Sequence, residues 1–366
     1  MEAKPLVNLF LEIAKIDALS GKEKSLAEYI KSFLKKYNYS ITEDVSHKFS
    51  NSDTGNLIIK VGNGGNFVLL SHMDTARPTI NLKPKILADK ILSSGDTVLG
   101  VDNRAGVTIL LYMLEKIAKE KIPVKDFTIA FTTCEETTLN GSKYLGVNGK
   151  IKYGFVFDSA YRPGSFINKA CGAIGFNIKI SGRASHSGLA PEKGINSIEI
   201  AAKALSKIKQ GRIDEETTLN FGKINGGSAV NVVPEFVLLE GEIRSLKERI
   251  VQELIKEIHE KFNSEVNAFG AKLEIEYDWD FKPYIIDDGS YIYKHIVKVI
   301  NKVGLTPQPK TSLGGSDANS LNENGIQSIN LGIGAQNPHS NDEFIFIEDL
   351  VKSAEIALEL VKKEEV

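Results

Sequence analysis

The chain has 366 residues, of which 42% are hydrophobic and 25% charged, and its formal net charge at pH 7 is −2. This length exceeds what one simple core usually holds, so two domains are expected. The nearly neutral charge balance gives no reason to expect a nucleic acid or an anionic membrane as a partner. The 2 cysteines form no CxxC pair, which suits a reducing compartment.

The first residues predict an amphipathic helix, because Leu6, Leu9, Phe10 and Ile13 recur at helical spacing. They contain no unbroken apolar stretch of the kind found in signal peptides. No segment elsewhere is apolar over a length that spans a bilayer, so we expect a cytoplasmic protein. Further on, residues 20–23 have the spacing of a capping box, which predicts the start of a second helix.

Three apolar runs of strand length end abruptly in side chains that bind metals. The runs cover residues 67–71, 127–134 and 153–157. The side chains that follow them are His72 and Asp74, Glu135 and Glu136, and Asp158. Such runs are typical of buried strands in a largely parallel sheet. Because the carboxyl ends of parallel strands form the ligand-binding edge of the sheet, we expect these side chains to converge there.

Two further candidates lie outside these runs. Asp102 is part of Gly-Val-Asp-Asn-Arg-Ala-Gly at residues 100–106, where a strong helical pattern begins, and His339 lies in a polar turn. Taken alone, Asp102 fits a helix N-cap that accepts backbone N–H groups. Together with the carboxylates and the imidazole at the strand ends, it favours a metal site.

The domain organisation follows from the order of the predicted elements. Strands and helices alternate up to about residue 172, which predicts a doubly wound α/β domain. Residues 173–280 show the order β-α-β-β-α-β of a ferredoxin-like unit, and the α/β pattern then resumes. We therefore expect residues 1–172 and 281–366 to form one domain, into which residues 173–280 are inserted.

Two metal ions about 3.5–4 Å apart need a carboxylate that bridges them and further ligands on each side. We expect Asp102 to be the bridge. The remaining ligands, grouped by ion, would be His72 with Asp158, and Glu136 with His339. Ligation by oxygen and nitrogen without thiolate fits zinc, with cobalt or manganese as alternatives.

Two acidic residues beside the ligands have other expected roles. Asp74 is two residues from His72 and can orient the imidazole or accept its second N–H. Glu135 points differently from its neighbour Glu136, and we expect it to be the general base. It would take a proton as a metal-bound hydroxide attacks, and return that proton to the leaving amine.

The motifs HMDT, GVDNRAG, CEE, FD and NPHSNDEF resemble, in order and context, those of the dinuclear-zinc M20 peptidases. That family includes peptidase T, carboxypeptidase G and succinyl-diaminopimelate desuccinylase. The resemblance covers essentially the whole chain, and it implies the same roles at the matching positions. It also implies a cis peptide between Asp102 and Asn103, and a catalytic domain of the zinc-exopeptidase type. The inserted domain would be a lid that supports a homodimer.

The resemblance implies three further site residues in the inserted domain. His186 resembles a lid histidine that helps to hold the oxyanion, often from a partner subunit, and an exposed loop histidine is the alternative. Asn231 and Arg244 resemble lid positions that contact substrate. Arg244 is two residues from Glu242 and points to the same side of the predicted strand, so a surface ion pair between them is the alternative.

A glycine-rich loop also resembles the family's substrate-binding loop, in which backbone N–H groups at a helix start can meet a carboxylate. An ordinary capped helix start is the alternative. The residues concerned are Gly314, Gly315 and Ser316.

Within the family, the sequence is most similar to the peptidase T branch. Asp158 indicates this branch, because carboxypeptidases and deacylases tend to have glutamate there. Asn103 and Arg104 depart from the branch, which argues against strict tripeptide specificity. We expect an aminopeptidase that releases N-terminal residues from short peptides. The alternatives are a deacylase or carboxypeptidase of the same family, an M42 aminopeptidase with a different insertion, and a non-catalytic metal- or peptide-binding module.

Overall fold

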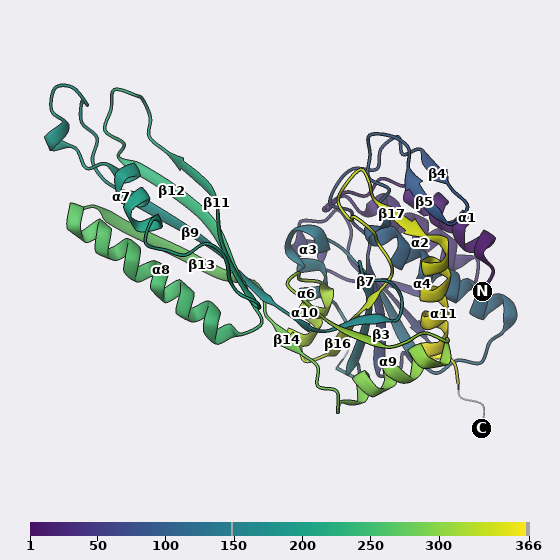
Figure 1. Cartoon of the computed structure of the whole chain (residues 1–366). Coiled ribbons are helices and arrows are strands. Elements are labelled where there is room, and N and C mark those ends of the chain that lie inside the picture. Colours follow the sequence, from purple (N-terminus) through teal and green to yellow (C-terminus); the bar gives the residue numbers. More distant parts are fainter. Residues whose placement is uncertain (148, 364–366) are drawn as a thin grey trace. The chain divides into compact units, whose positions relative to one another are not determined.

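The computed structural model describes residues 1–147 and 149–363, which form two compact units (Figure 1). The second unit consists of Ala170–Tyr284 together with Leu313–Gly315. The first unit contains the segments before, between and after these two. Within the described residues, no helix is long and apolar enough to cross a membrane.

A mixed nine-stranded sheet forms the centre of the first unit, in the order β1-β2-β6-β3-β7-β16-β8-β14, with β15 paired to β8. The strands are β1 (Ile41–Glu43), β2 (Leu57–Val61), β3 (Phe67–His72), β6 (Phe127–Thr132), β7 (Tyr153–Ser159), β8 (Ser165–Ala170), β14 (Tyr284–Ile285), β15 (Gln308–Ser312) and β16 (Gln327–Gly332). The parallel pairing predicted for the three apolar runs is confirmed, because β6, β3 and β7 are parallel neighbours, and β16 extends this set. The pairs β1-β2, β2-β6 and β16-β8 are antiparallel.

The helices of the first unit are α1 (Ala3–Ala14), α2 (Lys24–Lys35), α3 (His47–Ser50), α4 (Val101–Glu120), α5 (Glu135–Thr138), α6 (Asn140–Lys143), α9 (Tyr291–Lys302), α10 (Asp317–Glu323) and α11 (Ile347–Val361). Helix α4 packs against β3 and β7 and contacts α1 and α11. Its residues Val107, Leu110 and Leu111 have no exposed surface, as the helical spacing predicts. This buried helix carries the Asp102 motif at its N-terminal end.

A small second sheet was not predicted. It has the order β17-β5-β4, with β4 (Pro84–Ile86), β5 (Lys90–Ser93) and β17 (Phe344–Phe346). Strand β17 comes shortly after the turn that contains His339, and it pairs with β5 from the first half of the chain. In addition, the Asn341 amide donates to the Asp96 carbonyl at 3.1 Å. These contacts fix the His339 turn beside the N-terminal half.

The second unit contains a five-stranded antiparallel sheet in the order β10-β11-β12-β9-β13. Its elements are β9 (Gly172–Ser181), the 3₁₀ turn η1 (Pro191–Lys193), α7 (Ser197–Leu205), β10 (Gly211–Asp214), β11 (Thr217–Gly226), β12 (Phe236–Ser245), α8 (Glu248–Phe269) and β13 (Lys272–Phe281). The predicted β-α-β-β-α-β order is present, with β10 as an extra edge strand. Helix α7 begins at Ser197 because the Asn196 side chain caps its start by accepting from the Ile198 and Glu199 N–H groups.

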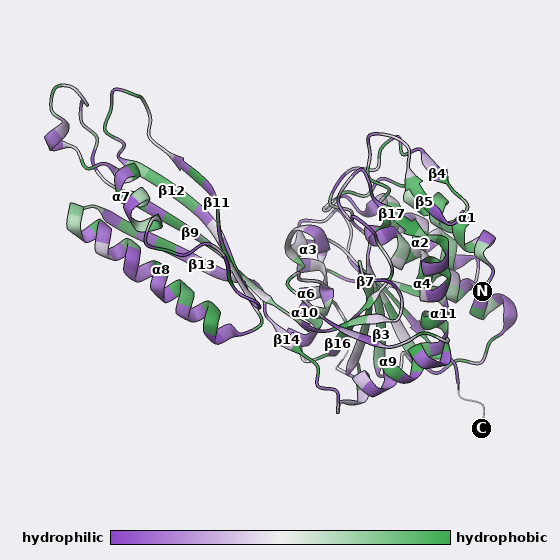
Figure 2. Ribbon diagram, viewed as in Figure 1, coloured by the Kyte–Doolittle hydropathy of each residue, from purple (hydrophilic) through white to green (hydrophobic). Residues whose placement is uncertain are grey.

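The core of the second unit lies between its sheet and its two helices. Helix α8 has an apolar stripe, visible in Figure 2 as green segments among purple ones. Its residues Val251, Ile258 and Phe262 are at most 2% exposed and pack with Ile178 and Leu239 of the sheet. This burial of one helix face explains why the unit has its own core.

Candidate metal centre

Asp102 lies between two imidazoles, one facing each of its carboxylate oxygens. Its Oδ1 is 3.1 Å from Nε2 of His72, and its Oδ2 is 3.3 Å from Nε2 of His339. No backbone N–H is capped by this carboxylate at the start of α4, so the N-cap interpretation is wrong for the described residues. A carboxylate whose two oxygens face different sets of ligands has the arrangement that a bridging ligand requires.

Each imidazole has a second carboxylate beside it. Nε2 of His72 lies 3.1 Å from Oδ1 of Asp158, and Nε2 of His339 lies 3.0 Å from Oε2 of Glu136. The structure thus brings together all five positions predicted as ligands. His72, Asp102 and Glu136 offer ligand atoms within 4.8 Å of one another.

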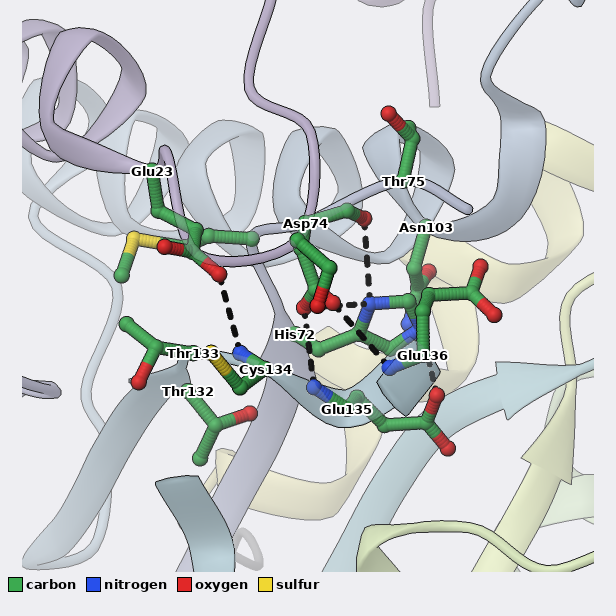
Figure 3. A network of polar contacts seen from close by, with 12 residues as sticks. Glu23, His72, Asp74, Thr75, Asn103, Thr132, Thr133, Cys134, Glu135 and Glu136 are labelled. Atoms are coloured by element: carbon green, nitrogen blue, oxygen red, sulfur yellow. Dashed lines mark hydrogen bonds and ion pairs between the residues drawn. The ribbon is translucent and has the colours of Figure 1, made fainter. Parts of the chain in front are cut away.

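The carboxylates of Glu135 and Glu136 point in different directions (Figure 3). Oε2 of Glu135 lies 3.9 Å from Nε2 of His72, and Glu135 forms with His72 and Asp158 a second group of ligand atoms within 4.8 Å. The two adjacent glutamates therefore serve different sides of the site, as expected from the sequence.

Asp74 contacts both the imidazole and the backbone of the two glutamates. Its Oδ1 is 3.3 Å from Nδ1 of His72 and accepts from the Glu135 N–H at 3.1 Å, and its Oδ2 accepts from the Glu136 N–H at 3.0 Å. The carboxylate has no exposed surface. It therefore orients the His72 ring and fixes the start of α5 at the same time.

The peptide between Asp102 and Asn103 is cis, as the family resemblance implies. The Asn103 side chain donates to the Phe157 carbonyl at 2.7 Å and to Oδ1 of Asp158 at 3.1 Å. Its own carbonyl accepts from the Gly106 N–H at 2.9 Å. Asn103 thus couples the start of α4 to the end of β7.

Sequence reasoning missed two further polar residues that hold the ligands. Glu343 accepts from the N–H groups of Gly100 at 2.6 Å and Asp102 at 3.0 Å. Asn330 donates to Oδ2 of Asp158 at 3.3 Å. Glu343 could have been found from the sequence, because it lies within the motif NPHSNDEF. Asn330 lies in the apolar strand β16, and no local sequence pattern indicates its contact with Asp158.

The pKa values show how much negative charge the site concentrates. Burial raises the pKa of Glu135 well above its usual value, and the carboxylates of Asp158 and Glu136 add to this rise. Hydrogen bonds to Asp102 and Glu136 raise the pKa of His339 to about 10. Burial alone would lower the pKa of His72, but the surrounding carboxylates raise it well above its usual range. The clustered carboxylates therefore favour positive charge at the positions of the two imidazoles.

A pair of divalent cations would supply positive charge at the same place, and the donor set fits them. Among the described residues, Oε1 of Glu136 is one of the buried side-chain atoms without a hydrogen-bond partner. A buried carboxylate oxygen without a donor is costly unless a cation occupies its free side. The residues present therefore fit a site of carboxylate and imidazole ligands for metal.

The remaining predicted site residues belong to the second unit or its border. His186 is exposed and accepts from the Gly188 N–H at 3.2 Å through Nδ1. A β-bridge joins it to Val232, next to Asn231. Two loops of the unit thus place His186 and Asn231 near each other.

Arg244 forms an ion pair with Glu242 at 3.1 Å and donates to the Leu313 carbonyl at 3.1 Å. The alternative of a surface ion pair thus has support. At the start of α10, the Ser316 N–H donates to the Asn319 side chain at 3.1 Å, so a capped helix start is present there. Gly315 approaches Phe281 so closely that an added Cβ would lie 2.4 Å from the ring.

Comparisons with known proteins agree with this geometry. Residues 168–269 match the model of a peptidase dimerisation domain of M20 type, and residues 79–180 match that of the M42 glutamyl aminopeptidases. Peptidase T of Fusobacterium nucleatum is 27% identical over 299 residues, which cover 77% of this chain and 69% of the relative. The second unit is an antiparallel sheet with two helices, as predicted for a ferredoxin-like insertion, and it is not the β-barrel expected of an M42 insertion.

Solved structures extend the similarity over the whole chain. A tripeptidase from Staphylococcus aureus is 31% identical, with a TM-score of 0.93, over 99% of this chain and 98% of that chain. The aminopeptidase PepT from Bacillus cereus is 30% identical, with a TM-score of 0.90, over 99% and 98%. The Bacillus subtilis YXEP protein, a dinuclear metal-binding peptidase from the M20 family, shares the fold at 16% identity and a TM-score of 0.77, over 98% and 97%. The chain belongs to the M20 family of metal-dependent peptidases, in its peptidase T-like branch.

Proposed function

We propose that the protein is an aminopeptidase that releases N-terminal residues from short peptides, using two divalent ions held across Asp102. The ions are zinc, with cobalt or manganese as alternatives. His72 and Asp158 would complete one ion, and Glu136 and His339 the other. The observation that carries the proposal is the position of Asp102 between two imidazoles, each with its own second carboxylate.

When bound, the ions would polarise the scissile carbonyl. They would also lower the pKa of a water molecule, so that it can lose a proton and attack the carbonyl. Glu135 is the general base in this proposal. It takes the proton of the attacking water and delivers it to the leaving amine. Asp74 keeps His72 in a fixed orientation through Nδ1.

Residues of the second unit contact the substrate in this proposal. His186 stabilises the oxyanion, while Asn231 and Arg244 contact the peptide. The exposure of His186 and Asn231 leaves both side chains accessible to a ligand. The loop at Gly314, Gly315 and Ser316 would hold a substrate carboxylate through its N–H groups.

We also propose that the protein is a homodimer through its second unit. The match of residues 168–269 to a peptidase dimerisation domain supports this assembly. Exposed apolar side chains on the same unit, Leu189 at 82% and Val230 at 104%, support it as well. Sedimentation velocity should give the mass of two chains, and a purely monomeric species over the working concentration range would contradict the proposal.

The substrate class is tested with one pair of peptides. The purified protein, loaded with zinc, is assayed on a tripeptide and on the same tripeptide with an acetylated N-terminus. An aminopeptidase needs the free amine, so the unmodified peptide should be hydrolysed much faster. A preference for the acetylated peptide would favour a deacylase, and release of the C-terminal residue first would favour a carboxypeptidase.

A further inference from the structure

Residues 133–136 follow the end of β6 and include Glu135 and Glu136. We call this turn the base turn. Cys134 has φ +52° in this turn, a left-handed conformation that residues other than glycine rarely adopt. Such a conformation persists only where the surroundings enforce it. The question is therefore which contacts hold the backbone at Cys134.

Side chains from elsewhere in the first unit accept hydrogen bonds from all four backbone N–H groups of the base turn. Asn56 accepts from Thr133 at 3.1 Å, and Glu23 accepts from Cys134 at 3.0 Å. The last two N–H groups, those of Glu135 and Glu136, donate to Asp74. Figure 3 shows Glu23 and Asp74 approaching neighbouring N–H groups of the turn.

Glu23 is fully buried, and both oxygens of its carboxylate accept hydrogen bonds. Oε1 accepts from the N–H groups of both Gly21 and Cys134, at 2.8 and 3.0 Å, and Oε2 accepts from the Ser52 hydroxyl at 2.5 Å. The capping box predicted at residues 20–23 is wrong, because α2 begins at Lys24, whose N–H donates to the Asp53 side chain at 2.9 Å. The carboxylate is directed to the base turn instead.

We infer that Glu23 is a positioning residue for Glu135 and Glu136, which acts through the N–H of Cys134. The inference rests on the proposed function, and it adds a group that touches neither metal nor substrate. Cys134 immediately precedes both glutamates, so a rotation of its backbone would displace the general base and a metal ligand together. A displacement of about 1 Å at reacting groups can reduce the rate about 10²-fold.

Two substitutions separate the position of the acceptor oxygen from the charge of the carboxylate. Glu23→Gln keeps an oxygen at the place of Oε1 and lets its amide donate to Ser52, but it removes the charge. Glu23→Asp keeps the charge and withdraws the oxygens by one methylene from Cys134. If Glu23 acts through the Cys134 N–H, Glu23→Asp is the damaging change and Glu23→Gln the tolerated one.

The matched control is Thr54→Val, which removes a buried hydrogen bond in the segment that contains Ser52. The Thr54 hydroxyl donates to Glu43 at 2.8 Å and does not contact the base turn. All variants are compared at saturating zinc over a range of peptide concentrations that extends to saturation, below the melting temperature of each. We expect Glu23→Asp to lose about 10²-fold in kcat with little change in KM, and the other two to keep kcat near the wild-type value.

A metal titration provides a readout that does not depend on turnover. Glu136 moves with the base turn, so Glu23→Asp should weaken the affinity for one of two cobalt ions about 10- to 100-fold and alter the visible spectrum of the bound cobalt. Glu23→Gln and Thr54→Val should bind both ions as the wild type does. If the wild type fails to hydrolyse peptides, the proposed function fails, and the titration still decides the role of Glu23.

The inference is overturned if Glu23→Asp keeps wild-type kcat and metal affinity. It is equally overturned if Glu23→Gln loses as much as Glu23→Asp, because the charge would then be the important property. A parallel loss in Thr54→Val would assign all the effects to the stability of the segment and would also overturn it.

Discussion

The imidazole of His339 lies 3.3 Å from the carboxylate of Asp102, although the whole second unit separates the two residues in the sequence. The contact depends on the pairing of β17 with β5, which fixes the chain just after the His339 turn. Asp102 has its other oxygen on His72, so each imidazole defines one side of the site. The two sides can be separated by mutation.

His339→Ala should remove one metal ion and leave the other. The variant loses a ligand only on the side of Glu136, so the metal content should fall from two ions to one per chain, with a large loss of activity. Metal analysis by mass spectrometry after dialysis checks the ratio. His47→Ala, at an exposed helix start, is the control and should retain both ions. Two tightly bound ions in His339→Ala would argue against the assigned ligand.

Glu135→Gln should abolish turnover without loss of metal. The amide cannot accept the proton of the attacking water, so kcat should fall at least ~10²-fold. Metal content and thermal stability should remain near those of the wild type, because the backbone contact of Glu135 with Asp74 is kept. Glu257→Gln on the exposed face of α8 is the control. Unchanged turnover in Glu135→Gln would mean that another group is the base, and a non-catalytic binding module would show no turnover in the wild type either.

Gly106→Ala should destabilise the first unit, because α4 approaches the sheet through this residue. An added Cβ would lie 2.3 Å from the Phe157 carbonyl and 2.5 Å from the Ser71 hydroxyl. Overpacking of this kind costs about 1–3 kcal/mol, which urea denaturation can measure. Gly95→Ala is the control, since nothing lies within 4 Å of its added Cβ, and it should change the free energy of unfolding by less than about 0.5 kcal/mol. Equal stability of the two variants would contradict the close packing of α4.

Glu43 should make the stability of the first unit sensitive to acid. Partial burial opposes its ionisation, but hydrogen bonds from Lys31, the Gly55 N–H and Thr54 lower its pKa to about 2. The folded pKa lies below the unfolded value of about 4.3, so the carboxylate stabilises the fold above that pH. This contribution is lost as the pH falls through about 4 to 2.

The measurement compares Glu43→Gln with the wild type by urea unfolding at pH 7, 4 and 2. The variant should be less stable at pH 7, and the difference should shrink toward pH 2. Glu28→Gln removes the more exposed partner of the same Lys31 and serves as the control. Its difference in stability from the wild type should not shrink toward pH 2. A constant difference at all three pH values would show that Glu43 acts through packing alone.

Local sequence patterns predicted the elements that position the site. The apolar runs before His72, Glu135 and Asp158 are β3, β6 and β7, because buried parallel strands require continuous apolar sequence. The side chains that follow these runs converge because the strands are parallel neighbours. The place of Asp102 in the site was predicted from the helical pattern that begins there and from the other metal-binding side chains at the strand ends.

Contacts between distant segments were not predictable in the same way. Glu23 has a local pattern that fits a capping box, but one of its partners, the Cys134 N–H, is more than a hundred residues away. Strand β10 is short and mostly polar, so its pairing at the sheet edge depends on β11 and not on its own composition. Asn330 likewise meets Asp158 only because β16 lies beside β7.

The order in which the ribosome makes the chain has a consequence for the site. Asp102, Glu136 and Asp158 are translated before the second unit, whereas His339 is translated after it. A nascent chain therefore lacks the imidazole beside Oδ2 of Asp102 until the inserted unit has been completed. The arrangement of two imidazoles around Asp102 is therefore complete only in a nearly finished molecule.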